Sequence, residues 1–258
     1  MQRLATPAGI MVSFERHGGG PPLVLVHGGF SDHRTNWTFA GPLLAQRFTL
    51  LAVARRGRGE TDATTGHTIE DEAADVAAVI EAAGEPVFLL GHSHGAQVAL
   101  AAAARVPERV RKLVLYEPPR RGMPTGAALT QLERLAAAGD WDGFAFTFFR
   151  DTIRVPAEEL EALRGTEHWP PILADAPATL HDLRALARYD FRPERFRSLR
   201  CPVMLQIGTE SPRDLFATDA LAAVLPDMRV EPLPGQAHEG MTTAPEAYAE
   251  SVRRFLLA

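Results

Sequence analysis

The sequence predicts an α/β fold in which a mostly parallel central sheet carries helices on both faces and a helical segment interrupts the series. Two short apolar runs, "LVLVHG" (23–28) and "PVFLLG" (86–91), are continuous, as in strands whose two faces are both buried. Helical patterns alternate with these runs, which is typical of βα units that build a parallel sheet. From about residue 120 to residue 196 the alternation stops, and only helical patterns remain.

The first part of the chain contains most of the predicted strands. A hairpin, "QRLATP" and "IMVSFERHG", turns at Ala8 and Gly9 and is followed by the buried strand 23–28. Strand 48–57, helix 68–84, strand 86–91, helix 96–107 and strand 111–119 come next. Helix 68–84 has acidic residues in its first turns, where the helix dipole favours negative charge. It ends at Gly84, because glycine readily adopts the backbone conformation that ends a helix.

The rest of the chain first departs from this alternation and then resumes it. Four helices are predicted between the last of these strands and residue 197, at 126–140, 142–153, 156–165 and 178–189. After "LRCP" the order is strand 203–208, helix 218–226, strand 229–235 and helix 245–258. One domain formed by residues 1–119 and 197–258 is therefore predicted, with 120–196 inserted into it. The ligand site of such a sheet lies at the carboxyl ends of its strands.

Charge and composition exclude several classes of partner. The 258-residue chain has a formal net charge of −5, whereas nucleic-acid binding needs a basic face. No apolar stretch approaches the ~20 residues of a membrane span, and the N-terminus lacks the apolar core of a secretion signal. The single cysteine, Cys201, allows no internal disulfide. We expect a cytoplasmic monomer or homodimer that acts on a small molecule and binds neither nucleic acid nor membrane.

The sequence predicts no metal and no cofactor. Asp32 and His33 are adjacent, but no other cluster adds ligands at the spacing of a metal site. The stretch "ARRGRGETD" (54–62) lacks the lysine and serine that end a phosphate-binding loop, and it is interpreted as a turn after a strand.

The motif "GHSHG", Gly91 to Gly95, lies where a buried strand is expected to become a helix. It matches G-x-S-x-G, in which a sharp, strained turn exposes the serine oxygen and the two glycines let strand and helix approach each other. Ser93 is therefore a candidate nucleophile.

A serine hydroxyl needs a base, and the base needs an anion on its other nitrogen. His92 and His94 adjoin Ser93 on the turn and point away from it, so His238, in the loop after the last strand, is the better base. The anion has three candidates: Glu117 after the strand at 111–119, and Glu210 or Asp214 after the strand at 203–208. Ion pairing of Glu117 with Arg120 or Arg121 is the competing interpretation for that residue.

Backbone N–H groups that bind a developing oxyanion are expected at two places. The segment "HGGF" (27–30) ends a buried strand and can direct the N–H of Gly29 at the substrate, and the N–H of His94 opens the helix after the serine. For the side chain of His27 we expect a structural role, bracing this loop.

Taken together, the segments "VHGGFSDHRTNW", "LLGHSHGAQVAL", "LVLYEPP", "VMLQIGTESP" and "LPGQAHEGM" resemble the α/β-hydrolase superfamily in type and order. The resemblance implies the α/β-hydrolase fold, with 120–196 as a helical cap, or lid, over the pocket. It makes Ser93 the nucleophile and His238 the base. The family's usual acid position is occupied here by Ser211, and Glu117 matches the position that a subset of the family uses instead.

This resemblance implies a serine hydrolase that cleaves a carboxylic ester or lactone through an acyl-enzyme on Ser93. Carbon–carbon bond hydrolysis, a non-hydrolytic cyclase or lyase, and a small-molecule receptor that retains the triad are the alternatives. The substrate is expected to be of medium size and largely apolar, with Phe30, Met241, Trp141 and Trp169 as its contacts.

Overall fold

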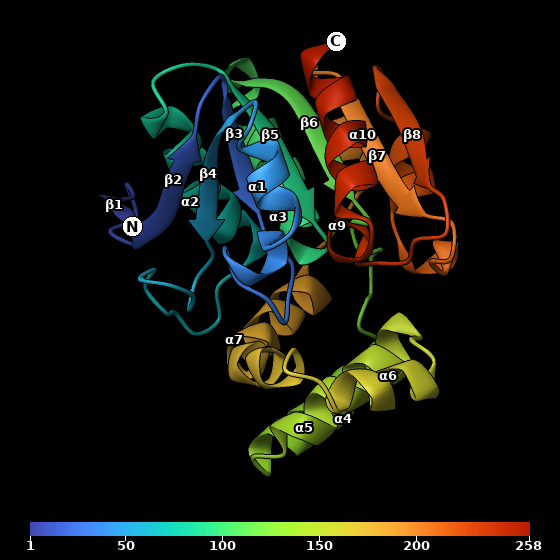
Figure 1. Cartoon of the computed structure of the whole chain (residues 1–258). Coiled ribbons are helices and arrows are strands. Elements are labelled where there is room, and N and C mark those ends of the chain that lie inside the picture. The colour runs from blue at the N-terminus through green and yellow to red at the C-terminus, as the bar shows by residue number, and fades with distance from the viewer.

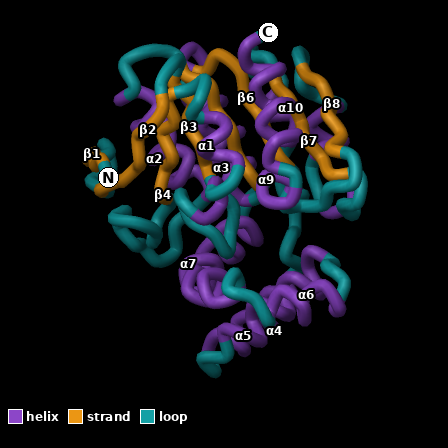
Figure 2. Tube along the Cα trace, in the orientation of Figure 1, coloured by secondary structure: helices purple, strands orange, loops and turns teal.

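Eight strands form one sheet in the order β1-β2-β4-β3-β5-β6-β7-β8 in the computed structural model, which describes all 258 residues. Only β2 runs antiparallel to its neighbours, and the remaining adjacent pairs from β4 to β8 are parallel. The predicted mostly parallel sheet is thereby confirmed, and Figure 2 shows its strands side by side with helices around them. The strands are β1 (Gln2–Ala5), β2 (Met11–Gly18), β3 (Pro22–Val26), β4 (Thr49–Ala54), β5 (Val87–His92), β6 (Val110–Tyr116), β7 (Val203–Gly208) and β8 (Met228–Leu233).

Helices cover both faces of the sheet. One apolar cluster joins the sheet to α2, α3 and α8, and a second joins the opposite face to α1 and α10. The helices of this domain are α1 (Ala40–Leu44), α2 (Ile69–Ala82), α3 (His94–Arg105), α8 (Thr218–Ala222), α9 (Gly240–Thr243) and α10 (Pro245–Leu257). None of the helices in the chain combines the length and apolarity needed to cross a lipid bilayer.

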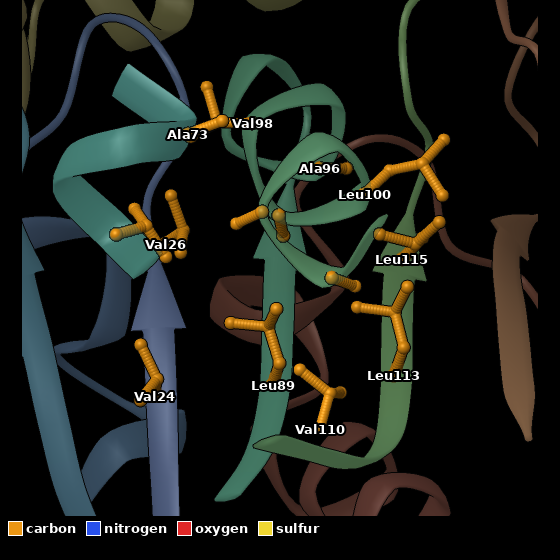
Figure 3. Packing of buried hydrophobic residues seen from close by; sticks show 14 of the residues in the cluster. Val24, Val26, Ala73, Leu89, Ala96, Val98, Leu100, Val110, Leu113 and Leu115 are labelled. Carbon is orange, nitrogen blue, oxygen red and sulfur yellow. The ribbon is translucent and has the colours of Figure 1, made fainter. Parts of the chain in front are cut away.

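The continuous apolar runs are explained by burial on both faces. In β3, Val24 and Val26 belong to the cluster under α2 and α3, whereas Leu23 and Leu25 belong to the cluster under α1 and α10. Figure 3 shows the first cluster, with Leu89 and Leu113 of the strands packed below side chains of α3. Because successive side chains point to opposite faces and both faces are covered, successive positions of β3 are all apolar.

A purely helical segment separates β6 from β7 and lies beyond the carboxyl ends of the strands (Figure 1). It contains α4 (Gly126–Ala137), α5 (Trp141–Thr147), α6 (Ala157–Arg164) and α7 (Trp169–Arg188). The helix predicted at 142–153 is α5 continued by a π-helical turn, Phe148–Ile153, and the helix predicted from 178 begins at Trp169. Prolines 170 and 171 occupy the first turn of α7, where proline is tolerated, and Pro177 lies inside it.

The helical segment and the sheet domain share a third apolar cluster. Phe30, after β3, packs against Phe144, Phe148 and Phe149, with ring centroids 5.7, 4.9 and 4.8 Å away. These aromatic contacts hold the helical segment over the carboxyl ends of the strands.

Candidate active site

Ser93 occupies a strained turn between the end of β5 and the start of α3. Its φ of 53° and ψ of −123° lie in a region that non-glycine residues rarely adopt. A Cβ at Gly91 would lie 2.4 Å from the carbonyl oxygen of Gly95, and one at Gly95 would lie 2.3 Å from the carbonyl oxygens of Val26 and His27. The turn therefore requires both glycines of the G-x-S-x-G motif. The close approach of strand and helix that they allow holds Ser93 in its strained backbone conformation.

The turn opens into a pocket between the sheet domain and the helical segment. Its apolar lining includes Phe30, Met123, Phe148, Phe149, Ile153 and Leu183. Its polar lining includes Ser93, His94, Thr179, Asp182, His238 and Glu239. Ser93 and His238, 145 positions apart in the sequence, thus line one cavity.

His238 and Glu117 form a close pair beside this pocket. The Nδ1–H of His238 donates to Oε2 of Glu117 at 2.5 Å, and Glu117 is completely buried. Burial alone would lower the pKa of His238, but the hydrogen bond and the negative charge of Glu117 outweigh it and raise the pKa above its usual value. The pairing fixes the tautomer, so Nε2 is the nitrogen that can accept a proton.

Three further side chains hold the loop that carries His238. The hydroxyl of Tyr116 accepts the N–H of Gly240 at 3.1 Å and donates to the carbonyl oxygen of Ala237. Nε2 of His92 lies 3.0 Å from the carbonyl oxygen of His238, and Phe216 stacks on the His238 ring at a centroid distance of 5.2 Å. Burial and the nearby His238 hold the pKa of His92 well below its usual value, so His92 is a neutral donor.

The two other acid candidates lie away from His238. Asp214 is paired with Arg154 at 2.8 and 2.9 Å, and its side chain is 62% exposed. Glu210 is exposed, and its carboxylate accepts a hydrogen bond only from the hydroxyl of its neighbour Thr209. Of the three carboxylates, the structure brings only Glu117 to the imidazole.

The loop after β3 presents its backbone to the pocket. Gly29 lines the pocket, and its N–H donates to no other group of the protein. The N–H of His94 belongs to the first residue of α3, where the helix itself offers no acceptor. The following N–H, from Phe30, is used differently, because it donates to the hydroxyl of Thr179 on α7 at 2.7 Å.

His27 is fully buried and supports this loop from behind. Its Nδ1–H donates to the carbonyl oxygen of Gly28 at 2.8 Å, and its Nε2 accepts the N–H of Arg55 at 3.2 Å. Burial and the charges of Arg55 and Arg58 hold its pKa well below the usual value. His27 is therefore a neutral structural side chain, in agreement with the role expected from the sequence.

The four predicted substrate contacts fall in different places. Phe30 lines the pocket. Met241, however, is packed in the core between the sheet and α10, and Trp169 is buried with its Nε1–H donating to Asp142 at 2.7 Å. Trp141 packs on Phe144 with ring centroids 5.5 Å apart. These three side chains pack within the core or between helices of the segment from α4 to α7, while Met123, Phe148, Phe149 and Ile153 line the pocket.

The sequence did not reveal a buried group of charges behind the pocket, here called the arginine cluster: Arg55, Arg58, Glu72, Asp175 and Asp182. Asp182 of α7 accepts four hydrogen bonds, two from Arg55 at 2.9 and 2.7 Å and two from Arg58 at 3.0 and 2.8 Å. Glu72 of α2 accepts from Arg55 at 2.9 Å and lies 2.5 Å from Nε2 of His94. The only signal in the sequence was "ARRGRG", whose partners lie far along the chain.

Two groups of side chains have the donor types of a metal site. Donor atoms of His67, Glu72 and Asp182 lie within 4.8 Å of one another, as do those of His92, His238 and Glu239 in the pocket. In the first group both carboxylates already pair with the fixed charges of Arg55 and Arg58. An added cation would meet two buried guanidinium groups there, so the geometry favours charge pairing over metal binding.

The comparisons with known proteins agree with this architecture. The model of the alpha/beta hydrolase family matches residues 23–251. A 2-(acetamidomethylene)succinate hydrolase of Mesorhizobium japonicum is 30% identical, over 96% of this chain and 92% of that protein. A pimeloyl-[acyl-carrier protein] methyl ester esterase of Methylococcus capsulatus is 32% identical, over 75% and 78%.

A solved α/β hydrolase from Sphaerobacter thermophilus superimposes with a TM-score of 0.86 and 30% identity, over 99% of this chain and all of that one. The chain therefore belongs to the α/β hydrolase family, and it is a hydrolase.

Proposed function

We propose that the chain is a serine hydrolase that cleaves a carboxylic ester or lactone through an acyl-enzyme on Ser93. The observation that carries this proposal is the pocket shared by a serine in a strained turn and an imidazole that is hydrogen-bonded at 2.5 Å to a buried carboxylate. In this assignment Ser93 is the nucleophile, His238 the general base and Glu117 the anion that orients it.

In the first half-reaction, Nε2 of His238 takes the proton of the Ser93 hydroxyl while the serine oxygen attacks the carbonyl carbon. The oxyanion that forms accepts hydrogen bonds from the N–H groups of Gly29 and His94. When the intermediate collapses, the bond to the leaving oxygen breaks and His238 gives that oxygen its proton. The acyl group stays on Ser93 as an ester.

In the second half-reaction, water replaces the leaving group. His238 takes a proton from this water as the water attacks the acyl-enzyme, and the same two N–H groups bind the second oxyanion. Collapse returns the proton to Ser93 and releases the carboxylic acid. Glu117 stays ionised throughout and stabilises the imidazolium.

The pocket supports a medium-sized, largely apolar substrate. Its apolar lining combines Phe30 of the sheet domain with Met123, Phe148 and Phe149 of the helical segment. We therefore assign residues 120–196 the role of a cap that selects the substrate. The Methylococcus relative is named for ester hydrolysis, which supports the choice of an ester.

Covalent labelling tests the proposal directly. A fluorophosphonate probe should label the wild-type chain rapidly on the peptide that contains Ser93, and Ser93→Ala and His238→Ala should abolish the labelling. Undiminished ester turnover by Ser93→Ala would reject the acyl-enzyme. A panel of p-nitrophenyl esters of graded chain length beside a panel of lactones then identifies the preferred acyl group.

A further inference from the structure

The arginine cluster contacts the peptide bond that the proposed mechanism uses. Nη2 of Arg55 donates to the carbonyl oxygen of Gly28 at 2.8 Å, and its Nε donates to the carbonyl oxygen of His27 at 2.9 Å. The Gly28 carbonyl and the Gly29 N–H belong to one peptide group. That peptide is trans, so its C=O and N–H point in opposite directions. A guanidinium bound to the carbonyl therefore fixes where the Gly29 N–H points.

This contact also acts on the strength of the N–H as a donor. A hydrogen bond from a charged donor to the carbonyl of a buried peptide polarises the whole group and strengthens the N–H on the other side. Arg55 is completely buried, so water does not screen its charge. His27 donates to the same carbonyl at 2.8 Å, which adds a second, neutral donor.

Helix α7 of the cap contacts both Arg55 and the loop that follows β3. Asp182 of α7 binds Arg55 through both carboxylate oxygens, and one turn earlier the hydroxyl of Thr179 accepts the Phe30 N–H. Nη2 of Arg58 donates to Thr179 at 3.2 Å, and Thr179 donates to Asp175 at 2.8 Å. Glu72 joins Arg55 to His94, the residue that carries the second N–H.

We propose that Arg55 is a positioning residue for the oxyanion hole: held by Asp182 of the cap, it orients and polarises the Gly28–Gly29 peptide, and Thr179 fixes the next residue of the same loop. The inference rests on the proposed function. It makes α7 a support of the reaction centre as well as a wall of the pocket.

Arg55→Lys tests the proposal, because lysine keeps the charge but lacks the planar fork that reaches the Gly28 carbonyl, Asp182 and Glu72 together. Since loss of one oxyanion donor costs about 100- to 1000-fold, misplacing it should lower kcat about 10- to 100-fold and leave KM within about twofold. The affinity for a trifluoromethyl ketone or boronic acid that forms the tetrahedral adduct should fall by the same factor. The affinity for an uncleaved amide analogue should stay unchanged.

Arg56→Lys is the matched control. Arg56 is also buried and paired, with Asp75 at 2.6 Å and Thr64 at 3.0 Å, but it contacts no residue of the loop 27–30. Its replacement should lower stability and leave kcat within about twofold of wild type, since a merely structural role does not change the transition state. Equal losses of kcat in Arg55→Lys and Arg56→Lys would overturn the proposal.

Thr179→Val and Thr179→Ser give a second test that leaves every hydrogen bond of Arg55 in place, although the valine variant also loses the bond from Arg58 to Thr179. Valine removes the acceptor of the Phe30 N–H at nearly constant volume, so kcat should fall about tenfold, and serine should restore it. If kcat stays at the wild-type level in Thr179→Val and in folded Arg55→Lys, the inference is wrong while the serine mechanism stands. If Ser93→Ala retains full turnover, the proposed function itself fails.

Discussion

Glu117 binds Gly208 as well as His238: its Oε1 accepts the Gly208 N–H at 2.8 Å, while Oε2 accepts from the imidazole. Gly208 ends β7, the strand after which most members of the family carry their acid, and Glu117 follows β6 next to it. The neighbouring strand therefore orients the carboxylate of Glu117 toward the imidazole of His238.

Removing the negative charge of Glu117 while keeping the shape of its side chain should nearly abolish turnover. In Glu117→Gln the side chain can still accept from Gly208, but it no longer stabilises an imidazolium, and we expect kcat to fall about 10³- to 10⁴-fold. Asp214→Asn, in an exposed ion pair, is the control and should stay within about twofold, because such pairs contribute little. Steady-state kinetics on one ester measure both, and the reverse ranking would move the acid to the later loop.

The activity should decline as the pH falls through the raised pKa of His238. His238 accepts a proton only when neutral, and Glu117 raises its pKa against the lowering effect of burial. The value of kcat/KM should therefore fall as the pH drops through a value above the usual ~6.5 of histidine. In Glu117→Gln the negative charge of Glu117 is gone and the charge of Glu239 is the remaining influence that raises the pKa of His238 against burial, so the residual activity should extend to lower pH. A midpoint that stays in place would contradict the pairing.

Low pH should decrease the stability of the fold, because the buried carboxylate of Glu72 becomes protonated. Burial would raise the pKa of this carboxyl, but Arg55 and His94 outweigh it and hold the pKa at about 2. A depressed carboxyl pKa contributes stability that is complete above the unfolded value, ~4.3, and is lost as the pH falls toward the folded value. Glu72→Gln should lower the free energy of unfolding by about 3–5 kcal/mol at neutral pH and flatten its decline between about pH 4 and 2.

Urea unfolding at several pH values measures this effect. Glu133→Gln is the control, because Glu133 forms a half-exposed pair with Arg184 and should change the free energy of unfolding by less than about 1 kcal/mol. Parallel pH profiles for wild type and Glu72→Gln would show that the buried carboxylate contributes nothing.

The glycine after the serine turn should tolerate no side chain. A methyl group at Gly95 would lie 2.3 Å from two backbone oxygens, whereas one at Gly126, which opens α4, meets nothing within 4 Å. Gly95→Ala should destabilise the chain by at least about 3 kcal/mol or prevent its folding, since backbone cannot move aside as a side chain does. Gly126→Ala should keep or raise the melting temperature. Similar melting temperatures for the two variants would contradict the close packing of β3 on α3.

The sequence predicted what depends on local pattern. β3 and β5 were found because each lies in a continuous apolar run, and the serine turn was found because its glycines flank Ser93 at fixed spacing. Glu117 was favoured by its place after a strand and by the serine at position 211, and the structure then puts it beside His238.

Contacts between distant segments were not predictable in the same way. Asp182 and Arg55 are separated by 127 positions, and nothing in the local pattern of α7 distinguishes a buried aspartate from a solvated one. The pocket lining was mispredicted for a related reason: Trp141, Trp169 and Met241 are large and apolar, but the direction of each side chain depends on tertiary packing. Phe148 and Phe149 reach the pocket from a π-helical turn that helical periodicity does not predict.

The helices of the segment 120–196 differ in whether they line the pocket, and this difference bears on how the enzyme could be re-engineered. No residue of α4 or α6 lines the pocket, whereas α7 contributes both Thr179 and Asp182 to it. Replacing the whole segment with one from another protein would therefore remove the contacts by which Thr179 and Asp182 support the proposed reaction centre, together with the present substrate selectivity. A chimera that keeps residues 175–186 and exchanges only the segment before them would retain turnover while accepting new acyl groups.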